Sequence, residues 1–331
     1  MRILYLTHAV PDYMSDDLLY GLRSILGADV VDFPRKDVLY RSSPLRAAAH
    51  EIYGGGFHCF GLDDLVIDRS ELAAKIAGGH FDVILNSSAW RIACPLHPQL
   101  AVIDGEDRPH LQPRYVRKVA LYWKRELPAP RSDVAPILFA LPDFLYDPTV
   151  LPRLKTHHAS YRLTSDIRRE LAGPFPPAYS FSTWADYQRD IKQSWFAISP
   201  RGGGYDCQRH YEILGQAVLC LYLDAQAPWQ LRERFRDGDN CLTFASVAEL
   251  EAKIAACREP QRLIDRGRED LERHHLAAQR AREVLDDITQ RELRPRRPSL
   301  RDQLAWRLWL RFGSRKLAHF TPQPVTRPTR A

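Results

Sequence analysis

Strand-like and helix-like segments alternate along almost the whole chain, and this alternation limits the fold more than any other feature. Short aliphatic runs such as residues 2–6 and 81–85 flank segments whose apolar residues recur at helical spacing, as at Leu18, Leu19 and Leu22. Strands that alternate with helices form parallel sheets with helices on their faces. The pattern therefore predicts an α/β protein.

The alternation breaks near residue 150 and then resumes, which divides the chain into two units. The segment DPTVLPRLKTHH, residues 147–158, lies at the break. We therefore expect an N-terminal Rossmann-like domain over residues 1–151 and a C-terminal Rossmann-like domain over residues 152–290. A basic helix and tail follow over residues 291–331. A length of 331 residues suits two domains of ordinary size.

Charge and composition exclude several classes of protein. Residues 291–331 contain 11 Lys and Arg against 2 Asp and Glu, a balance of +9; since the whole chain carries +6, the first 290 residues carry −3. The body is therefore not basic, and we expect no nucleic-acid partner. No apolar run approaches the ~20 residues that span a bilayer, and the absence of a signal-peptide pattern predicts a cytoplasmic protein. The six cysteines form no C-x-x-C pair, so we expect no metal site.

A triple glycine lies between a strand-like run and a helix-like run, in SPRGGGYDCQRHYEILG, residues 199–215. Ligands of open α/β folds bind at the carboxyl ends of parallel strands. We therefore expect Gly202, Gly203 and Gly204 to adopt positive φ and to let the backbone approach a ligand closely. The alternative is a loose turn. The segment contains neither GK[ST] nor G-x-G-x-x-G, so a Walker loop or a nicotinamide cofactor is not indicated.

Charged side chains flank these glycines. Arg201 precedes them, and Arg209 and Glu212, three residues apart, share one face of the following helix. Arginines suit a diphosphate, and a carboxylate suits sugar hydroxyls. The group predicts a site for a nucleoside-diphosphate sugar, whereas the alternative is an ordinary ion pair on a helix surface.

The longer segment WFAISPRGGGYDCQRHYEILGQAVLCLYLD resembles the C-terminal signature of exostosin-type and related glycosyltransferases. The pattern, an aliphatic run and then SPRG-x-G-x-D-x-x-R-x-x-E, is matched at Ser199, Pro200, Arg201, Gly202, Gly204, Asp206, Arg209 and Glu212. The resemblance covers about residues 180–285. It implies a GT-B fold, in which two Rossmann-like domains with parallel sheets face a cleft, usually without a bound metal. It also implies that Arg201, Arg209 and Glu212 hold a nucleotide-sugar donor. The segment GQAVLCLYLD departs from the small-residue turn of the family.

We therefore predict a glycosyltransferase that moves a sugar from a nucleoside-diphosphate sugar to a glycan, a lipid-linked glycan or another hydroxyl acceptor. The donor is a substrate, and no further cofactor is expected. Two alternatives remain open. A nucleotide-sugar epimerase can share the fold, and a non-catalytic protein could bind the sugar nucleotide or act as a scaffold.

A sugar transfer needs a base for the acceptor hydroxyl or a group that steadies the departing diphosphate. Polar side chains follow two strands of the first domain, and they are His8, Asp12, Asp16, Asp17, Asp104, Glu106 and Asp107. From these we select His8, Asp17 and Asp107 as catalytic candidates. The alternative for Asp17 is a helix N-terminal charge that the macrodipole favours. The alternative for Asp107 is a solvated turn.

The basic tail contains a dense set of apolar and aromatic residues, which are Leu300, Leu304, Trp306, Leu308, Trp309, Leu310 and Phe312. Such residues among arginines are typical of a helix that lies on an anionic membrane surface. One interpretation is therefore peripheral contact with the inner face of a membrane. The other is that the helix packs back across the first domain, with its aromatic residues in the core. A macromolecular partner is the third.

Overall fold

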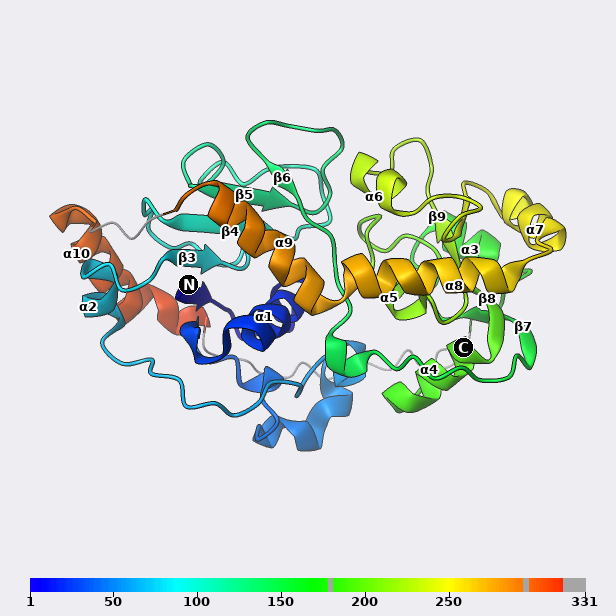
Figure 1. Ribbon diagram of the computed structural model, residues 1–331, viewed down its shortest axis with the longest axis horizontal. Coiled ribbons are helices and arrows are strands. Elements are labelled where there is room, and N and C mark those ends of the chain that lie inside the picture. Colours follow the sequence, from blue (N-terminus) through cyan, green and yellow to red (C-terminus); the bar gives the residue numbers. More distant parts are fainter. Residues whose placement is uncertain (178–180, 294–297, 318–331) are drawn as a thin grey trace.

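The computed structural model describes residues 1–177, 181–293 and 298–317, and it places two α/β units side by side (Figure 1). The first unit contains a fully parallel sheet in the order β2-β1-β3-β4-β5-β6. Its strands are β1 Ile3–Leu6, β2 Val30–Phe33, β3 Val83–Asn86, β4 Leu100–Asp104, β5 Leu121–Lys124 and β6 Ala135–Pro136. The order places β1 between β2 and β3, so the chain changes direction across the sheet at β1.

Helices cover both faces of this sheet. Helices α1 Tyr13–Leu26 and α9 Ala277–Gln290 lie on one face, and α2 Leu72–Ala77 and α10 Leu300–Leu308 lie on the other. The alternation of side chains along a strand supplies both cores: Ile3 and Tyr5 face α1, whereas Leu4 and Leu6 face α2. Short 3-10 turns complete the unit: η1 Gly27–Asp29, η2 Asp37–Leu39, η3 Pro44–Glu51, η4 Tyr53–Gly56 and η5 Asp143–Leu145.

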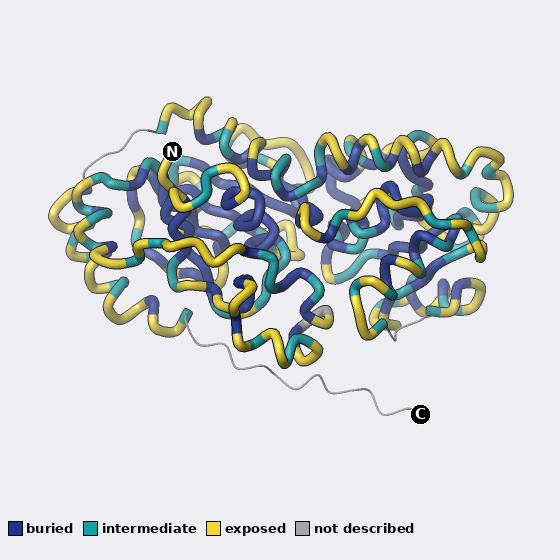
Figure 2. Tube along the Cα trace, turned by 60° about the horizontal axis from the view of Figure 1, so that its bottom comes forward, coloured by how far each residue is buried: buried dark blue, intermediate teal, exposed yellow. Residues whose placement is uncertain are grey.

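The second unit repeats the scheme with a parallel sheet in the order β10-β9-β8-β7. Its strands are β7 Lys155–Ala159, β8 Ser194–Ser199, β9 Val218–Tyr222 and β10 Leu242–Phe244. One face carries α4 Trp184–Lys192, α5 Gln208–Ile213 and α6 Trp229–Arg234; the other carries α3 Asp166–Leu171, α7 Val247–Ala256 and α8 Pro260–Asp270. Figure 2 shows buried residues in the interior of both units.

Within the described residues, the chain crosses between the units after β6 and again after α8 (Figure 1). Helix α8 leads through the π-helical segment η6 Leu271–His275 into α9, which packs along α1 (Figure 1). At this crossing Leu141 donates to the carbonyl of His275, and Ala277 donates to the carbonyl of Leu141, each at 2.8 Å. Residues 277–290, which the sequence places in the C-terminal domain, therefore lie on the N-terminal sheet.

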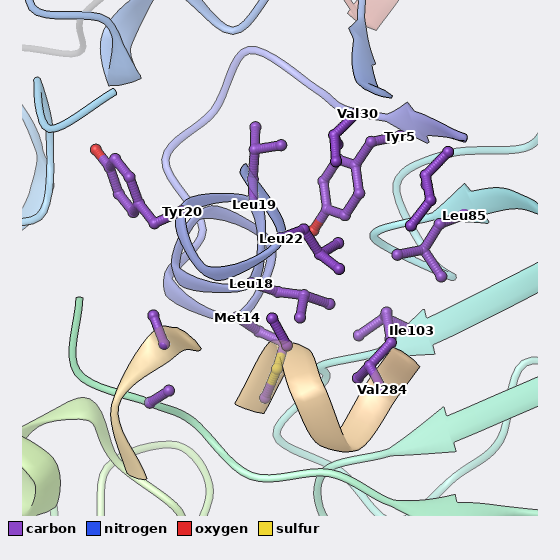
Figure 3. Packing of buried hydrophobic residues seen from close by; sticks show 14 of the residues in the cluster. Tyr5, Met14, Leu18, Leu19, Tyr20, Leu22, Val30, Leu85, Ile103 and Val284 are labelled. Carbon is purple, nitrogen blue, oxygen red and sulfur yellow. The ribbon is translucent and has the colours of Figure 1, made fainter. Parts of the chain in front are cut away.

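The close packing of α9 on α1 depends on a glycine. A Cβ atom on Gly21 would lie 1.9 Å from the carbonyl oxygen of Ala277, so no larger residue fits between the helices. Figure 3 shows Met14 and Leu18 of α1 beside Val284 of α9, within the same buried cluster. The chain returns to the first unit because this apolar face of α9 is buried there.

The basic tail also returns to the first unit. Helix α10 lies beside α2, and it continues into the π-helical segment η7 Trp309–Gly313 and the 3-10 turn η8 Ser314–Leu317, which contribute Trp309, Leu310 and Leu317 to the same core cluster. The Trp306 side chain is fully buried in the core of the N-terminal sheet. Residues 318–331 of the predicted tail lie outside the described residues. Among the described residues, no helix combines the length and apolar character that crossing a membrane requires.

Candidate functional site: the edge of the N-terminal sheet and the glycine loop

A cavity of about 240 Å³ opens at the carboxyl edge of the N-terminal sheet. This edge, beside β1, is where the chain changes direction, and ligands of open α/β sheets bind at such a point. The lining residues follow β1, β3, β4 and β5, or lie on the linker to the second unit: Pro11, Asp12, Tyr13, Ser88, Trp90, Arg91, Gly105, Glu106, Asp107, Arg125 and Phe139.

The acidic residues after β4 divide into two kinds. Asp104 is fully buried, and it accepts hydrogen bonds from Lys124 Nζ at 2.9 Å and from the hydroxyl of Tyr122. It is held in the core as the partner of a buried lysine. Glu106 and the half-exposed Asp107 line the cavity, and Asp107 forms an ion pair with the buried Arg125. The cavity therefore has carboxylates that can face a ligand.

The candidates after β1 lie deeper. His8 is buried, with its Nε2 atom 3.3 Å from Oδ2 of Asp12. Burial lowers the pKa of His8. Burial alone would raise the pKa of Asp12, but the hydrogen bond and charge of His8, the charge of Lys36 and the backbone amide of Ser15 together outweigh it, and the pKa falls to about 2. Asp12 also forms the N-cap of α1, by accepting from the backbone amide of Ser15. His8 therefore meets the cavity wall through Asp12.

Asp16 and Asp17, adjacent on the first turns of α1, have different partners. Asp16 forms an ion pair with the buried Lys36. Asp17 lies with Oδ1 3.3 Å from Nδ1 of His58. Both side chains are buried, and Asp16 lies in the first turn of α1, where the helix macrodipole favours a negative charge.

The glycine loop is an interface between the two units. A Cβ atom on Gly203 would lie 2.1 Å from Oδ2 of Asp107, and one on Gly204 would lie 2.3 Å from Oε1 of Glu126. The loop is anchored further at Asp206, whose backbone amide donates to the same Glu126 oxygen at 3.0 Å. The Asp206 side chain accepts from the amide of Phe139 at 2.9 Å.

The expected positive φ in this loop is wrong. Gly202, Gly203 and Gly204 are absent from the positive-φ residues of the chain. Carboxylates of the first unit occupy the space that a side chain at 203 or 204 would take, and at 204 the carboxylate belongs to the buried Glu126. The sequence predicted a close approach to a ligand, whereas the close approach in the structure is to the N-terminal unit.

The two arginines of the predicted donor site have no fixed ionic partner. Within the described parts of the chain, the side chains of Arg201 and Arg209 form no hydrogen bond and no ion pair. The Arg201 guanidinium lies 5.1 Å from the centre of the Tyr205 ring. Arg209 is half-buried, and its charge helps to lower the pKa of Glu212. Half-buried cations without a partner are suited to an anionic ligand.

Glu212 lies at the junction of the units. Its Oε2 atom accepts a hydrogen bond from the Tyr187 hydroxyl at 2.8 Å, and its Oε1 atom lies 3.0 Å from Nε2 of His58. Burial would raise the pKa of Glu212, but His58, Tyr187 and the charge of Arg209 together outweigh it, and the pKa is lowered. His58 thus stands between Glu212 of the second unit and Asp17 of the first.

The charges of this group favour a protonated imidazole. Burial would lower the pKa of His58, but Asp17 and Glu212 raise it to about 9. Burial raises the pKa of Asp17 to about 7 even though His58 opposes the shift. Sequence analysis missed His58, and the only signal near it is the chain's other triple glycine, at residues 54–56.

Of the predicted residues, the structure therefore brings Asp107 to the glycine loop, and it brings Asp17 to Glu212 through His58. His8 is not joined to either group by a recorded hydrogen bond among the described residues. In the same part of the chain, no group of three or more His, Cys, Asp or Glu side chains is arranged to hold a metal ion.

Comparison with known proteins agrees with this architecture. Residues 183–286 match a family model described as "Glycosyl transferase-like". No curated protein sequence matches the chain.

Solved structures align over most of the chain. HepE of Anabaena in complex with UDP aligns with a TM-score of 0.53 at 10% identity, over 88% of this chain and 100% of that one. Its complex with UDP-glucose aligns with a TM-score of 0.51 at 10% identity and the same coverage. A glycosyltransferase from Rickettsia africae aligns with a TM-score of 0.51 at 8% identity, over 88% of this chain and 98% of that one.

The GT-B fold predicted from the sequence is therefore confirmed. The prediction of a glycosyltransferase is confirmed by the family match together with this fold. The narrower exostosin-type resemblance stays a prediction, because the matching family has the broader description.

Proposed function

We propose that the protein transfers a sugar from a uridine-diphosphate sugar to a carbohydrate hydroxyl. The C-terminal unit would hold the donor, and the cavity of the N-terminal sheet would hold the acceptor. The glycine loop joins the two half-sites, because it belongs to the donor unit and rests on Asp107 of the acceptor cavity. The choice of uridine is supported by the UDP and UDP-glucose complexes of the Anabaena protein.

The observation that carries the donor half is the pairing of an unpartnered arginine with a buried carboxylate. Arg209 and Glu212 lie one helical turn apart in the segment that matches the family model. A guanidinium presents a planar fork of donors that suits diphosphate oxygens. A carboxylate accepts two hydroxyl hydrogen bonds, as a ribose or sugar offers. Arg201 supplies a second cation on the other side of the glycines.

The acceptor half has the chemistry of a sugar site. Trp90, which lines the cavity, is 44% exposed, yet its Nε1 atom is fixed by hydrogen bonds of 3.2 Å to both carboxylate oxygens of Asp104. A fixed, exposed indole offers a flat apolar surface for the C–H face of a sugar ring. Glu106 and Asp107 lie beside it and can accept sugar hydroxyls. Asp107 is also the candidate base that lies nearest the glycine loop.

Titration with UDP tests the donor half. Arg209→Ala and Glu212→Gln should each weaken UDP binding about tenfold to a hundredfold, because a hydrogen bond to a charged group contributes about 1.5–3 kcal/mol. Arg262→Ala, an exposed arginine on α8, is the matched control and should bind UDP as the wild type does. Unchanged UDP affinity in both site variants would remove the donor site from this loop.

Trp90→Ala tests the acceptor half. The variant should raise the KM for a glycan acceptor and leave UDP affinity unchanged, because the indole touches only the acceptor. Leu96→Ala, another exposed apolar residue that follows β3, is the control. An unchanged acceptor KM in Trp90→Ala would contradict the sugar site.

Product analysis separates the alternatives. A transferase releases UDP and extends the acceptor glycan by one sugar. A nucleotide-sugar epimerase returns a donor with altered stereochemistry and leaves the acceptor unchanged. A protein that binds the donor without releasing UDP or altering the sugar, over a panel of glycans, would be a non-catalytic binder.

A further inference from the structure

We propose that the outer face of α10 and η7 is a docking surface for an anionic membrane. Four large apolar side chains, Leu300, Leu304, Leu308 and Phe312, follow one another at intervals of four residues. They are 84%, 56%, 49% and 54% exposed, respectively. We call these four residues the outer stripe. Contiguous exposed apolar residues on a folded protein mark an interaction surface.

The outer stripe is not needed to hold the helix in place. Trp306 is buried in the core of the N-terminal sheet, and Trp309 and Leu310 pack against the same cluster. The helix is therefore apolar on two sides, of which one is used in folding. Two of the three interpretations that the sequence left open, membrane contact and packing on the first domain, are thus compatible, because different side chains of one helix serve each of them.

The charge around the outer stripe indicates what covers it. Over residues 298–317 the exposed cations are Arg301, Arg307, Arg311, Arg315 and Lys316, and the single acidic residue is Asp302. The guanidinium carbons of Arg311 and Arg315 lie 5.2 and 5.7 Å from the centre of the Phe312 ring. Apolar residues framed by basic ones match the acyl region and the anionic headgroups of a lipid surface.

A second copy of the chain fits this surface less well. A two-fold contact through the outer stripe would place the same five cations of two molecules against each other, and like charges across an interface oppose association. A lipid surface instead supplies the opposite charge over the whole length of the helix.

The position of the helix relates the membrane to the acceptor cavity. The backbone amide of Ala9 donates to the carbonyl of Leu317 at 2.7 Å, just before Pro11 at the cavity wall. The centre of the Trp306 ring lies 6.2 Å from that of His97, and His97 belongs to the same segment between β3 and β4 as Trp90. An acceptor held in the membrane would therefore lie near the cavity. This last step rests on the proposed function, whereas the membrane contact does not.

Sedimentation of the full chain with vesicles tests the membrane contact. Vesicles of phosphatidylcholine with about one third phosphatidylglycerol should bind the protein at low salt, and binding should fall as the salt concentration rises. Vesicles of phosphatidylcholine alone should bind it more weakly. A wild-type chain that ignores the anionic vesicles at low salt would overturn the proposal.

Paired substitutions then locate the surface. Leu304→Ser with Leu308→Ser should reduce vesicle binding by at least about tenfold, because both side chains enter the acyl boundary. Leu154→Ser with Leu163→Ser is the matched control, since these leucines of the second unit are 70% and 49% exposed. That pair should bind vesicles as the wild type does. Equal binding by the outer-stripe pair and the wild type would overturn the proposal.

Two further measurements keep the test independent of folding and of the proposed function. Arg307→Glu with Arg311→Glu should lose binding to anionic vesicles by a similar factor; retained binding would count against the proposal. UDP affinity should be unchanged in all three pairs, so a chain that binds vesicles but no UDP would fail the proposed function alone. A wild-type dimer that the outer-stripe pair converts to a monomer would assign the surface to self-association instead.

Discussion

The Nε2 atom of His58 lies 3.0 Å from the Oε1 atom of Glu212, and this contact joins the two units of the molecule. His58 belongs to the N-terminal unit and is supported from behind by Asp17 at 3.3 Å. Glu212 is the carboxylate that we assign to the donor. A donor hydroxyl that takes the place of His58 would therefore change the contact between the units as it binds.

The His58 group predicts a pH dependence of stability. The pKa of His58 is raised from 6.5 to about 9, so the folded chain binds a proton more tightly than the unfolded chain does. The contribution of protonated His58 to the stability of the fold is complete below about pH 6.5 and is lost as the pH rises through about 9. The pKa of Asp17 is raised from 3.8 to about 7, so stability also falls as the pH rises between these values.

The free energy of unfolding, measured with urea, should therefore fall between pH 6.5 and pH 9 by up to about 3 kcal/mol. His58→Asn should remove most of this slope. His50→Asn, at an exposed histidine, is the control and should keep it. A wild-type stability that rises with pH across this window would contradict the assigned protonation.

The glycine loop predicts a graded response to added methyl groups. Gly204→Ala should be severe, because Glu126 beside it is buried and cannot move away. Gly203→Ala should be milder, since the half-exposed Asp107 can turn toward solvent. Gly173→Ala has only an ordinary contact of 3.6 Å and is the control. The effects are measured as changes in the temperature of thermal unfolding and in UDP affinity. Equal effects of the substitutions at 203 and 204 would contradict the different environments of Asp107 and Glu126.

Substitutions of Asp104 and Asp107 should affect different properties, stability for Asp104 and turnover for Asp107. Asp104→Asn leaves the buried Lys124 without its charged partner and should destabilise the fold by about 3–5 kcal/mol. Asp107→Asn should leave the fold nearly intact and lower kcat by about 10²–10⁴ if Asp107 is the base. UDP affinity should then be unchanged. Normal turnover in Asp107→Asn would move the base to Asp17, His8 or another group.

The basic tail predicts opposite results for two of its residues. Trp306→Ala should destabilise the chain by about 3–5 kcal/mol, since it empties a fully buried site in the N-terminal core. Leu304→Ala, on the exposed outer stripe, should change stability by less than about 0.5 kcal/mol. A comparison of urea midpoints decides this, and a stable Trp306→Ala variant would mean that the tail does not fold on the sheet. Removal of residues 291–331 should likewise destabilise the chain.

The sequence by itself determined the class of fold, and it predicted the half of the candidate site that lies in one continuous segment. Apolar periodicity is a local property of the sequence, so the alternation of strands and helices could be predicted without knowledge of any tertiary contact. Arg201, the glycines, Arg209 and Glu212 lie within twelve residues, and their order alone indicated a donor site. A short segment carries its own geometry because a strand, a turn and a helix fix the relative positions of its side chains.

Only the tertiary structure decided which residues of the two units contact one another. His58 and Glu212 are 154 residues apart in the chain, and no local pattern could pair them. The reason for Gly203 and Gly204 likewise lies with carboxylates of the other unit. The tail shows the same limit: its composition fitted either a membrane or a core, and packing assigned Trp306 to the core while leaving Leu304 exposed. Sequence records which side chains are apolar or charged, whereas burial depends on which surfaces meet.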